Sequence, residues 1–163
     1  MPAMMTRIFA LAFVAGALGC APANYAYSFD LTDPGARNLQ KPGERDTLED
    51  ADVKSEILVD PTSFQAILLD VTNKTEVPLQ VAWDQISIVE PDHSQVPLHP
   101  DSGLGAVESQ ARVTARLVPF SLPSVGSAAT AYDNTDFELV VPMIVRGAPR
   151  EMRYHLHART HKL

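Results

Sequence analysis

Apolar side chains recur at every second position over much of the chain after residue 54, the spacing that places them on one face of a β-strand. The runs "SEILVD" (55–60) and "SFQAILLDVTN" (63–73) are rich in Ile, Leu, Val and Phe and end in turn-forming residues. The second run is apolar on both faces, which is typical of a strand covered on both sides. "PLQVAWD" (78–84) alternates instead and puts Leu79, Val81 and Trp83 on the predicted inner face.

The alternation changes phase after Asp84. Ile86 and Ile88 are even-numbered, whereas the preceding inward residues are odd-numbered, so burying both sets requires a bulge or bend near Asp84 and Gln85. Strands also use such bends when they cross between sheets. "VPLHP" (96–100) then predicts a short edge strand, because proline lacks the N–H that a central strand donates.

Residues 101–135 predict loops with short pairing segments, because Pro and Gly interrupt the pattern repeatedly. One helical turn fits residues 106–111. "VTARLVPFSLP" (113–123) contains at least one strand.

The clearest element is a hairpin near the end of the chain. Odd-numbered apolar residues of 137–145 share one face, and even-numbered apolar residues of 152–158 share one face of the second strand. With "RGAPR" (146–150) as the turn, we expect a register that places Arg146 opposite Glu151, Met143 opposite Tyr154, Val141 opposite Leu156, Leu139 opposite Ala158, and Glu138 opposite Arg159.

Short strands at this spacing, with no long helical pattern, predict an all-β fold, an antiparallel two-sheet immunoglobulin-like β-sandwich over residues 54–163. Trp83 is expected in its core. The segment "VTNKTEVPLQVAWDQISIVEPD" (71–92) resembles the Ig-like modules of uncharacterised bacterial lipoproteins and of the water-stress and hypersensitive-response group. That resemblance implies the fold and assigns no catalytic residue.

The first twenty residues have a different pattern. Arg7 precedes an uninterrupted apolar run over residues 8–18, which as a helix would span only about 16 Å, half of a bilayer core. The run therefore predicts the apolar region of a signal peptide rather than a membrane anchor, and small residues close it as signal peptidase requires. Cys20 follows directly and is the only cysteine of the chain.

Ala17-Leu18-Gly19-Cys20 resembles the lipobox of bacterial lipoproteins, although the leucine of the commonest form stands one position later here. The resemblance implies cleavage between Gly19 and Cys20, removal of the signal peptide (1–19) and lipidation of Cys20, which becomes the membrane contact. Ala21 is not the Asp that marks inner-membrane retention, so the implied location is the outer membrane, facing the periplasm. Two or three acyl chains suffice for lasting anchoring.

Residues 20–53 show no sustained period and carry several Pro and Gly residues and the acidic stretch "ERDTLEDAD" (44–52). They predict a lipid anchor followed by a flexible tether. The alternative is that residues 25–31, where Tyr25, Tyr27 and Phe29 alternate, pair as a first edge strand.

Composition limits the function. The 163 residues suffice for one domain, and the net charge of −7 argues against a nucleic-acid partner. One cysteine permits no intramolecular disulfide. If the Cys20 thiol is consumed by lipid, the folded domain has no thiol chemistry.

Candidate chemistry is sparse. His155, His157 and His161 are the best metal candidates, because alternate strand residues project together and imidazole suits Zn and Cu. Arg153 and Arg159 flank them, which favours a solvated basic face instead. "PDHS" (91–94) is interpreted as a turn rather than a catalytic triad, "GLGAVE" (103–108) falls short of a dinucleotide motif, and "NKT" (73–75) predicts a hairpin turn.

We therefore assign no catalytic residue, no metal ligand and no cofactor. Two functions stay open. The first is a non-enzymatic envelope lipoprotein that binds an envelope protein partner or supports an assembly. The second is a small-ligand or metal-binding periplasmic lipoprotein.

Overall fold

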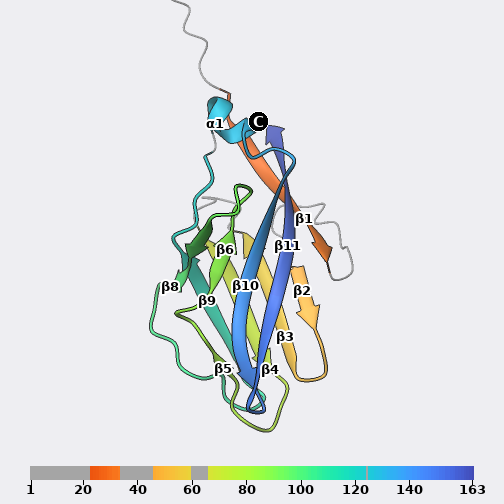
Figure 1. Cartoon of the computed structure of the whole chain (residues 1–163), viewed down its shortest axis with the longest axis vertical. Coiled ribbons are helices and arrows are strands. Elements are labelled where there is room, and N and C mark those ends of the chain that lie inside the picture. Colours follow the sequence, from red (N-terminus) through yellow and green to blue (C-terminus); the bar gives the residue numbers. More distant parts are fainter. Residues whose placement is uncertain (1–22, 34–45, 60–65, 124) are drawn as a thin grey trace, which may run out of the picture.

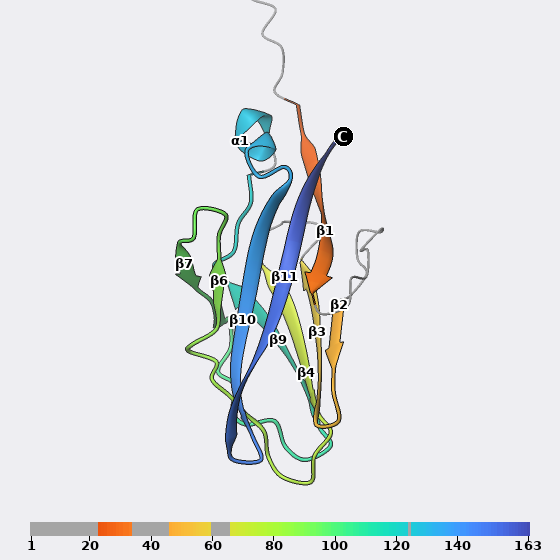
Figure 2. The same ribbon diagram turned by 45° about the vertical axis from the view of Figure 1, so that its right-hand side comes forward.

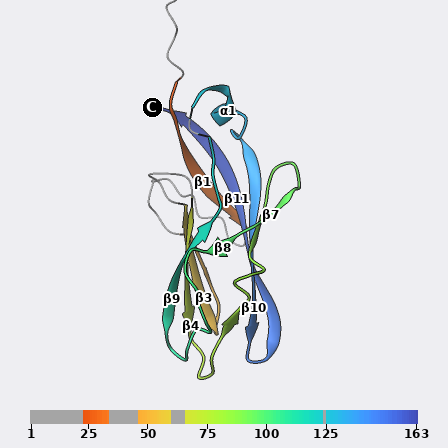
Figure 3. The ribbon, with the colours of Figure 1, turned by 90° about the vertical axis from the view of Figure 1, so that its left-hand side faces the viewer.

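The structure is a computed structural model, and it describes residues 23–33, 46–59, 66–123 and 125–163. Two antiparallel β-sheets pack face to face (Figures 1 and 3). The first has the strand order β1 (Tyr25–Asp33), β11 (Ala148–Lys162), β10 (Thr135–Val145), β6 (Ser87–Val89) and β7 (Gln95–Pro97), with β5 (Gln80–Val81) also pairing with β10. The second has the order β2 (Asp46–Glu49), β3 (Val53–Val59), β4 (Ile67–Asn73), β9 (Arg112–Val118) and β8 (His99–Pro100). The predicted all-β, two-sheet antiparallel sandwich is confirmed.

The core lies between the sheets and is built by the predicted alternation. The fully buried side chains include Ile57, Ile67, Leu69, Leu117, Leu139, Tyr154 and Leu156. Each buried residue of this size contributes about 1.5–3 kcal/mol of transfer free energy. Trp83 is buried as predicted, with 8% of its surface exposed, and its indole N–H donates to the Gly105 carbonyl at 2.9 Å. Inside the core, the hydroxyls of Ser55 on β3 and Tyr154 on β11 form a hydrogen bond that joins the two sheets.

The predicted break near Asp84 and Gln85 is confirmed, and its cause lies on the neighbouring strand. β6 pairs with β10 at residues 138–140 and β5 pairs with it at residues 143 and 144, so the gap faces Pro142. Proline has no N–H to donate there, and its carbonyl accepts the Ala82 N–H at 3.0 Å. The turn that follows brings both apolar sets into the core, and Ile86 and Ile88 are buried.

The chain stays in the first sheet at this break, because β5 and β6 both pair with β10. The chain crosses later, within "VPLHP": β7 ends at Pro97 in the first sheet, and β8 begins at His99 in the second. Leu98 between them is fully buried and donates its N–H to Ile86. The expected edge strand therefore becomes two short edge strands, one in each sheet.

The β10–β11 hairpin exists as predicted, but the expected register is wrong. Val145 pairs with Ala148, so that Met143 faces Arg150, Val141 faces Met152, Leu139 faces Tyr154 and Glu138 faces His155. The turn holds two residues rather than five, with φ of 50° at Arg146 and 80° at Gly147. Positive φ at both positions is the signature of a type I′ turn, whose twist suits a hairpin. The partners shift by four positions, so each side chain keeps its predicted face.

The prediction of a flexible tether over residues 20–53, with the domain starting at 54, is wrong for two segments. β1 pairs with β11 along residues 155–162, and β2 pairs with β3 along residues 54–57. The alternative prediction, in which residues 25–31 pair as a first edge strand, is therefore correct, although the strand continues to Asp33. The remaining tether positions, 20–22 and 34–45, lie outside the described residues.

Residues 101–135 contain the seven-residue strand β9 and the short helix α1 (Gly126–Thr130). The helical turn expected at 106–111 is instead a β-bridge between Val107 and Leu79 followed by a turn. Within the described part of the chain, no helix has both the length and the apolar character needed to cross a membrane.

Candidate functional site

Gly19 and Cys20, the predicted cleavage and lipidation residues, lie outside the described residues. The signal peptide and the lipid anchor therefore stay sequence predictions.

The histidine stripe of β11 lies beside carboxylates that come from β10. His157 contacts Asp136 through Nδ1 at 2.7 Å and Asn134 through Nε2 at 3.1 Å, and Nε2 of His155 lies 3.5 Å from a Glu138 oxygen. The predicted basic face is therefore mixed in charge, because carboxylates of β10 lie beside its histidines. Among the described residues, no three His, Cys, Asp or Glu side chains converge as a metal site would need.

Arg153 lies on the same face of β11 as these histidines, which is the outer face of the first sheet. Its guanidinium pairs with Glu138 at 2.7 Å and with Glu151 at 2.6 Å, and these carboxylates raise its pKa. The face is therefore a ladder of exposed acid–base pairs, each of which contributes little to stability.

"PDHS" forms the predicted turn, in which the Ser94 N–H donates to Asp92 at 2.9 Å. The turn brings His93 to the same open depression of about 390 Å³ as His155 and Glu138. "GLGAVE" has no adjacent helix, and its Gly105 supports Trp83 as described above.

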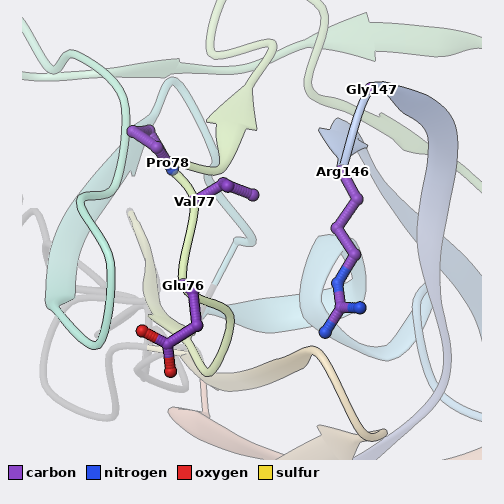
Figure 4. Close-up of a pocket in the computed structure, with 5 residues that line it drawn as sticks. All are labelled: Glu76, Val77, Pro78, Arg146 and Gly147. Carbon is purple, nitrogen blue, oxygen red and sulfur yellow. The ribbon is translucent and has the colours of Figure 1, made fainter.

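A different surface combines exposed apolar side chains with a fixed backbone. We call it the distal end; it comprises the β4–β5 loop (74–79), the Arg146–Gly147 turn and the β2–β3 turn (50–52), and it lies opposite α1 (Figure 1). An open depression of about 550 Å³ here is lined by Glu76, Val77, Pro78, Arg146 and Gly147. Figure 4 shows the Val77 side chain pointing across it toward the Arg146–Gly147 turn, while the Glu76 carboxylate points away. Val77 is 45% exposed.

The buried amide of Asn73 holds the β4–β5 loop in place. Its Nδ2 donates to the carbonyls of Val77 at 2.8 Å, Val107 at 3.0 Å and Glu108 at 3.2 Å, while its Oδ1 accepts the Thr75 N–H at 2.9 Å. The hairpin turn predicted at "NKT" is wrong, because β4 lies in the second sheet and β5 in the first, so these residues begin a loop that crosses between the sheets. The sequence also did not indicate that Asn73 would be fully buried. Val77 is thus presented from a rigid loop.

Ion pairs join the β10–β11 hairpin of the first sheet to the β2–β3 turn of the second sheet at this end. Arg146 pairs with Asp52 at 2.9 Å, and Arg150 pairs with Asp50 at 2.6 Å. Burial alone would raise the pKa of Asp50, but hydrogen bonds from the Val53 and Asp52 N–H groups, with the charge of Arg150, outweigh it and hold that pKa below its usual range. Lys74 pairs with Glu49 at 2.9 Å, and its hydrogen bond lowers the pKa of Glu49.

The β10–β11 hairpin also lines a second open depression, of about 580 Å³, on the outer face of the first sheet. Pro142, Pro149 and Ile144, which is 41% exposed, give it an apolar floor. The turn of this hairpin lines the first depression, and its two strands line the second. The lining combines apolar side chains with charged ones, which are Glu76 and Arg146 in the first depression and Arg150 and Glu151 in the second.

The fold and this surface define an antiparallel β-sandwich with a preorganised apolar loop surface. Comparison of the chain with protein-family models, curated proteins and solved structures found no match in any of the three.

Proposed function

We propose that this chain is a lipid-anchored bacterial cell-envelope protein, held at the outer membrane by Cys20 and facing the periplasm, whose sandwich binds a protein partner through the distal end. The lipid anchor rests on the sequence pattern of residues 7–20. The observation that carries the binding role is the exposed Val77, which the buried Asn73 fixes opposite the Arg146–Gly147 turn.

The strand order supports an immunoglobulin-like interpretation of the sandwich. β3-β4-β9-β8 over β11-β10-β6-β7 corresponds to the ABED and GFCC′ sheets of that fold, with β1 and β2 as an N-terminal addition. In this correspondence, the β4–β5 loop and the β10–β11 turn are the B–C and F–G loops. These loops form the binding end of immunoglobulin variable domains, and the comparison of function is an analogy of fold.

The chemistry of the distal end indicates the kind of partner. An apolar side chain that covers Val77 and Pro78 would gain about 25 cal/mol per Å² removed from water. Arg146 is 64% exposed despite its ion pair, so the rim favours a partner with an acidic group. The loops need little ordering on binding, which lowers its entropic cost.

Lipidation is tested by labelling cells with palmitate. The wild-type chain is expected to incorporate label and fractionate with the outer membrane, and Cys20→Ser is expected to lose both. Unchanged labelling of Cys20→Ser would refute the anchor.

Partner binding is tested with a photo-crosslinking amino acid at Val77, with exposed Ala128 on α1 as the matched control at the opposite end. A discrete protein adduct is expected from position 77 only, and Cys20→Ser should reduce it by removing the domain from the membrane. An adduct with the mass of two copies of this chain, or identical adducts from both positions, would contradict a distinct partner at the distal end.

A further inference from the structure

The end of the sandwich that carries α1 fixes the chain only three residues after Cys20. The Ala23 carbonyl accepts the Gly126 N–H at 2.9 Å, Asn24 forms a β-bridge with Val125, and the Asn24 carbonyl accepts the Leu163 N–H at 3.0 Å. A fully extended chain covers at most about 3.6 Å per residue, so Ala23 lies within about 11 Å of Cys20. The arm between the predicted lipid and the fold is therefore short.

We infer that the α1 end lies against the bilayer and that the domain stands end-on, with the distal end farthest from the membrane. The inference rests on the proposed lipidation of Cys20. A lipidated cysteine sits at the membrane interface, where its acyl chains enter the hydrocarbon. An arm of about 11 Å cannot carry the anchor past the α1 end to the opposite end of the sandwich.

β1 is the element that creates this orientation. Without β1 and β2, the chain would enter the sandwich at Val53, beside Asp50 and Asp52 of the distal end. β1 pairs antiparallel with β11 and begins where β11 ends, beside α1 (Figure 2). The added strand thus moves the start of the folded chain to the end opposite the candidate binding surface.

The segment that carries α1 is uncharged, which suits a membrane surface. The sequence from Leu117 to Tyr132 contains no Asp, Glu, Lys, Arg or His, in a chain of net charge −7. Val125, Ser127 and Ala128 are exposed there. These uncharged side chains avoid the desolvation penalty that charged groups would incur close to the bilayer. The neighbouring end of β11 does carry charge, mostly basic, at Arg159, His161 and Lys162.

The length of β11 determines how far the end-on orientation holds the distal end from the membrane. Its 15 residues rise about 3.3 Å each, so about 46 Å separates Ala148 from Lys162. In an end-on domain, the Val77 depression is therefore held tens of ångströms from the lipid. A partner would meet it without approaching the headgroups.

The test uses the full-length lipidated protein in vesicles of phosphatidylethanolamine with a minority of phosphatidylglycerol and an acceptor-labelled lipid. Ala128→Cys and Ala148→Cys are each labelled with a donor dye. Both sites are exposed, and each new thiol is the only free one once Cys20 carries lipid. Energy transfer to the acceptor lipid is expected to be strong from position 128 and weak from position 148.

A flexible Gly/Ser insert of about 20 residues between Cys20 and Ala23 is the control for the short arm. Such an insert has a root-mean-square reach of about 25 Å, so the difference between the two positions should shrink. Equal transfer from both positions without the insert, in protein that carries palmitate, would overturn the end-on orientation alone. Absence of palmitate would refute the proposed anchor and, with it, the inference.

Discussion

The two ends of the sandwich are stabilised in different ways. At the distal end, a buried amide, Asn73, organises the β4–β5 loop, and ion pairs fasten loops of one sheet to the other. At the α1 end, the hydroxyl of Tyr27 lies 2.6 Å from the Pro123 carbonyl and 3.0 Å from that of Ala129, and backbone hydrogen bonds hold Ala23 and Asn24. A charged end with exposed apolar loops suits a protein partner in water, whereas at the α1 end the α1 segment is uncharged and the charged residues lie on the end of β11 and at Asp133.

The largest effect is expected from Asn73→Ala. The substitution leaves the buried Thr75 N–H without its acceptor, which costs about 1–3 kcal/mol, and it removes one of two donors from each of the Val77 and Val107 carbonyls, which costs about 0.5–1.5 kcal/mol each. We expect the free energy of unfolding to fall by about 3 kcal/mol in urea titrations. Gln80→Ala removes an exposed amide from the adjoining strand and should change it by less than about 0.5 kcal/mol. Equal effects would show that Asn73 does not organise the distal end.

A smaller effect is expected at the α1 end from Tyr27→Phe. Losing the hydroxyl should cost about 1.5 kcal/mol, because buried carbonyls lose a donor. Tyr25→Phe, on the same strand, is the matched control. If both variants unfold at the same urea concentration, the hydroxyl of Tyr27 does not stabilise the α1 end.

Tyr27 also gives the α1 end a pH dependence. Burial, assisted by the nearby Tyr132, raises its pKa from 10.0 to about 12, because the buried phenolate is poorly solvated. The folded state then retains a proton that the unfolded state releases, so stability is full below pH 10 and declines as the pH rises toward 12, by at most about 1.4 kcal/mol per pH unit. Urea midpoints of the wild type and Tyr27→Phe should converge over this range. Parallel curves would contradict a buried phenol.

The alternation in the sequence correctly predicted which face of the sheet each side chain of the β10–β11 hairpin occupies, but it did not predict which residues pair across the hairpin. Reversing every face of the β10–β11 hairpin would require a one-residue slip, which burial forbids, so Leu139 and Tyr154 point inward in the expected and the observed register alike. Burial does not distinguish registers that differ by an even shift, and turn geometry decides among them. Arg-Gly is not the usual Asn-Gly signal of a two-residue turn.

Contacts between segments that are distant in the sequence could not be predicted either, because alternation does not show which strands become neighbours. The His157 stripe looked wholly basic because Asp136 and Glu138 come from the neighbouring strand. The break at Asp84 was visible in the phase of the pattern, but its cause, Pro142, lies more than fifty residues later. β1 was obscured by the Pro and Gly residues that follow it, and its pairing depends on β11 at the far end of the chain.

The smallest effect on stability is expected from substitutions of Arg146. Two such variants distinguish its role in the turn from its role in partner binding. Arg146→Asn suits the left-handed position at φ 50° better than arginine does but loses the exposed ion pair with Asp52, so the free energy of unfolding should change by less than about 0.5 kcal/mol. Arg146→Ala loses the same ion pair without that conformational benefit and should be less stable than the Asn variant by about 1 kcal/mol. If the guanidinium contributes to the rim of the binding surface, both variants weaken the crosslink from position 77 equally despite their different stabilities. A crosslink that follows stability instead would assign Arg146 to the turn and leave recognition to Val77 and Pro78.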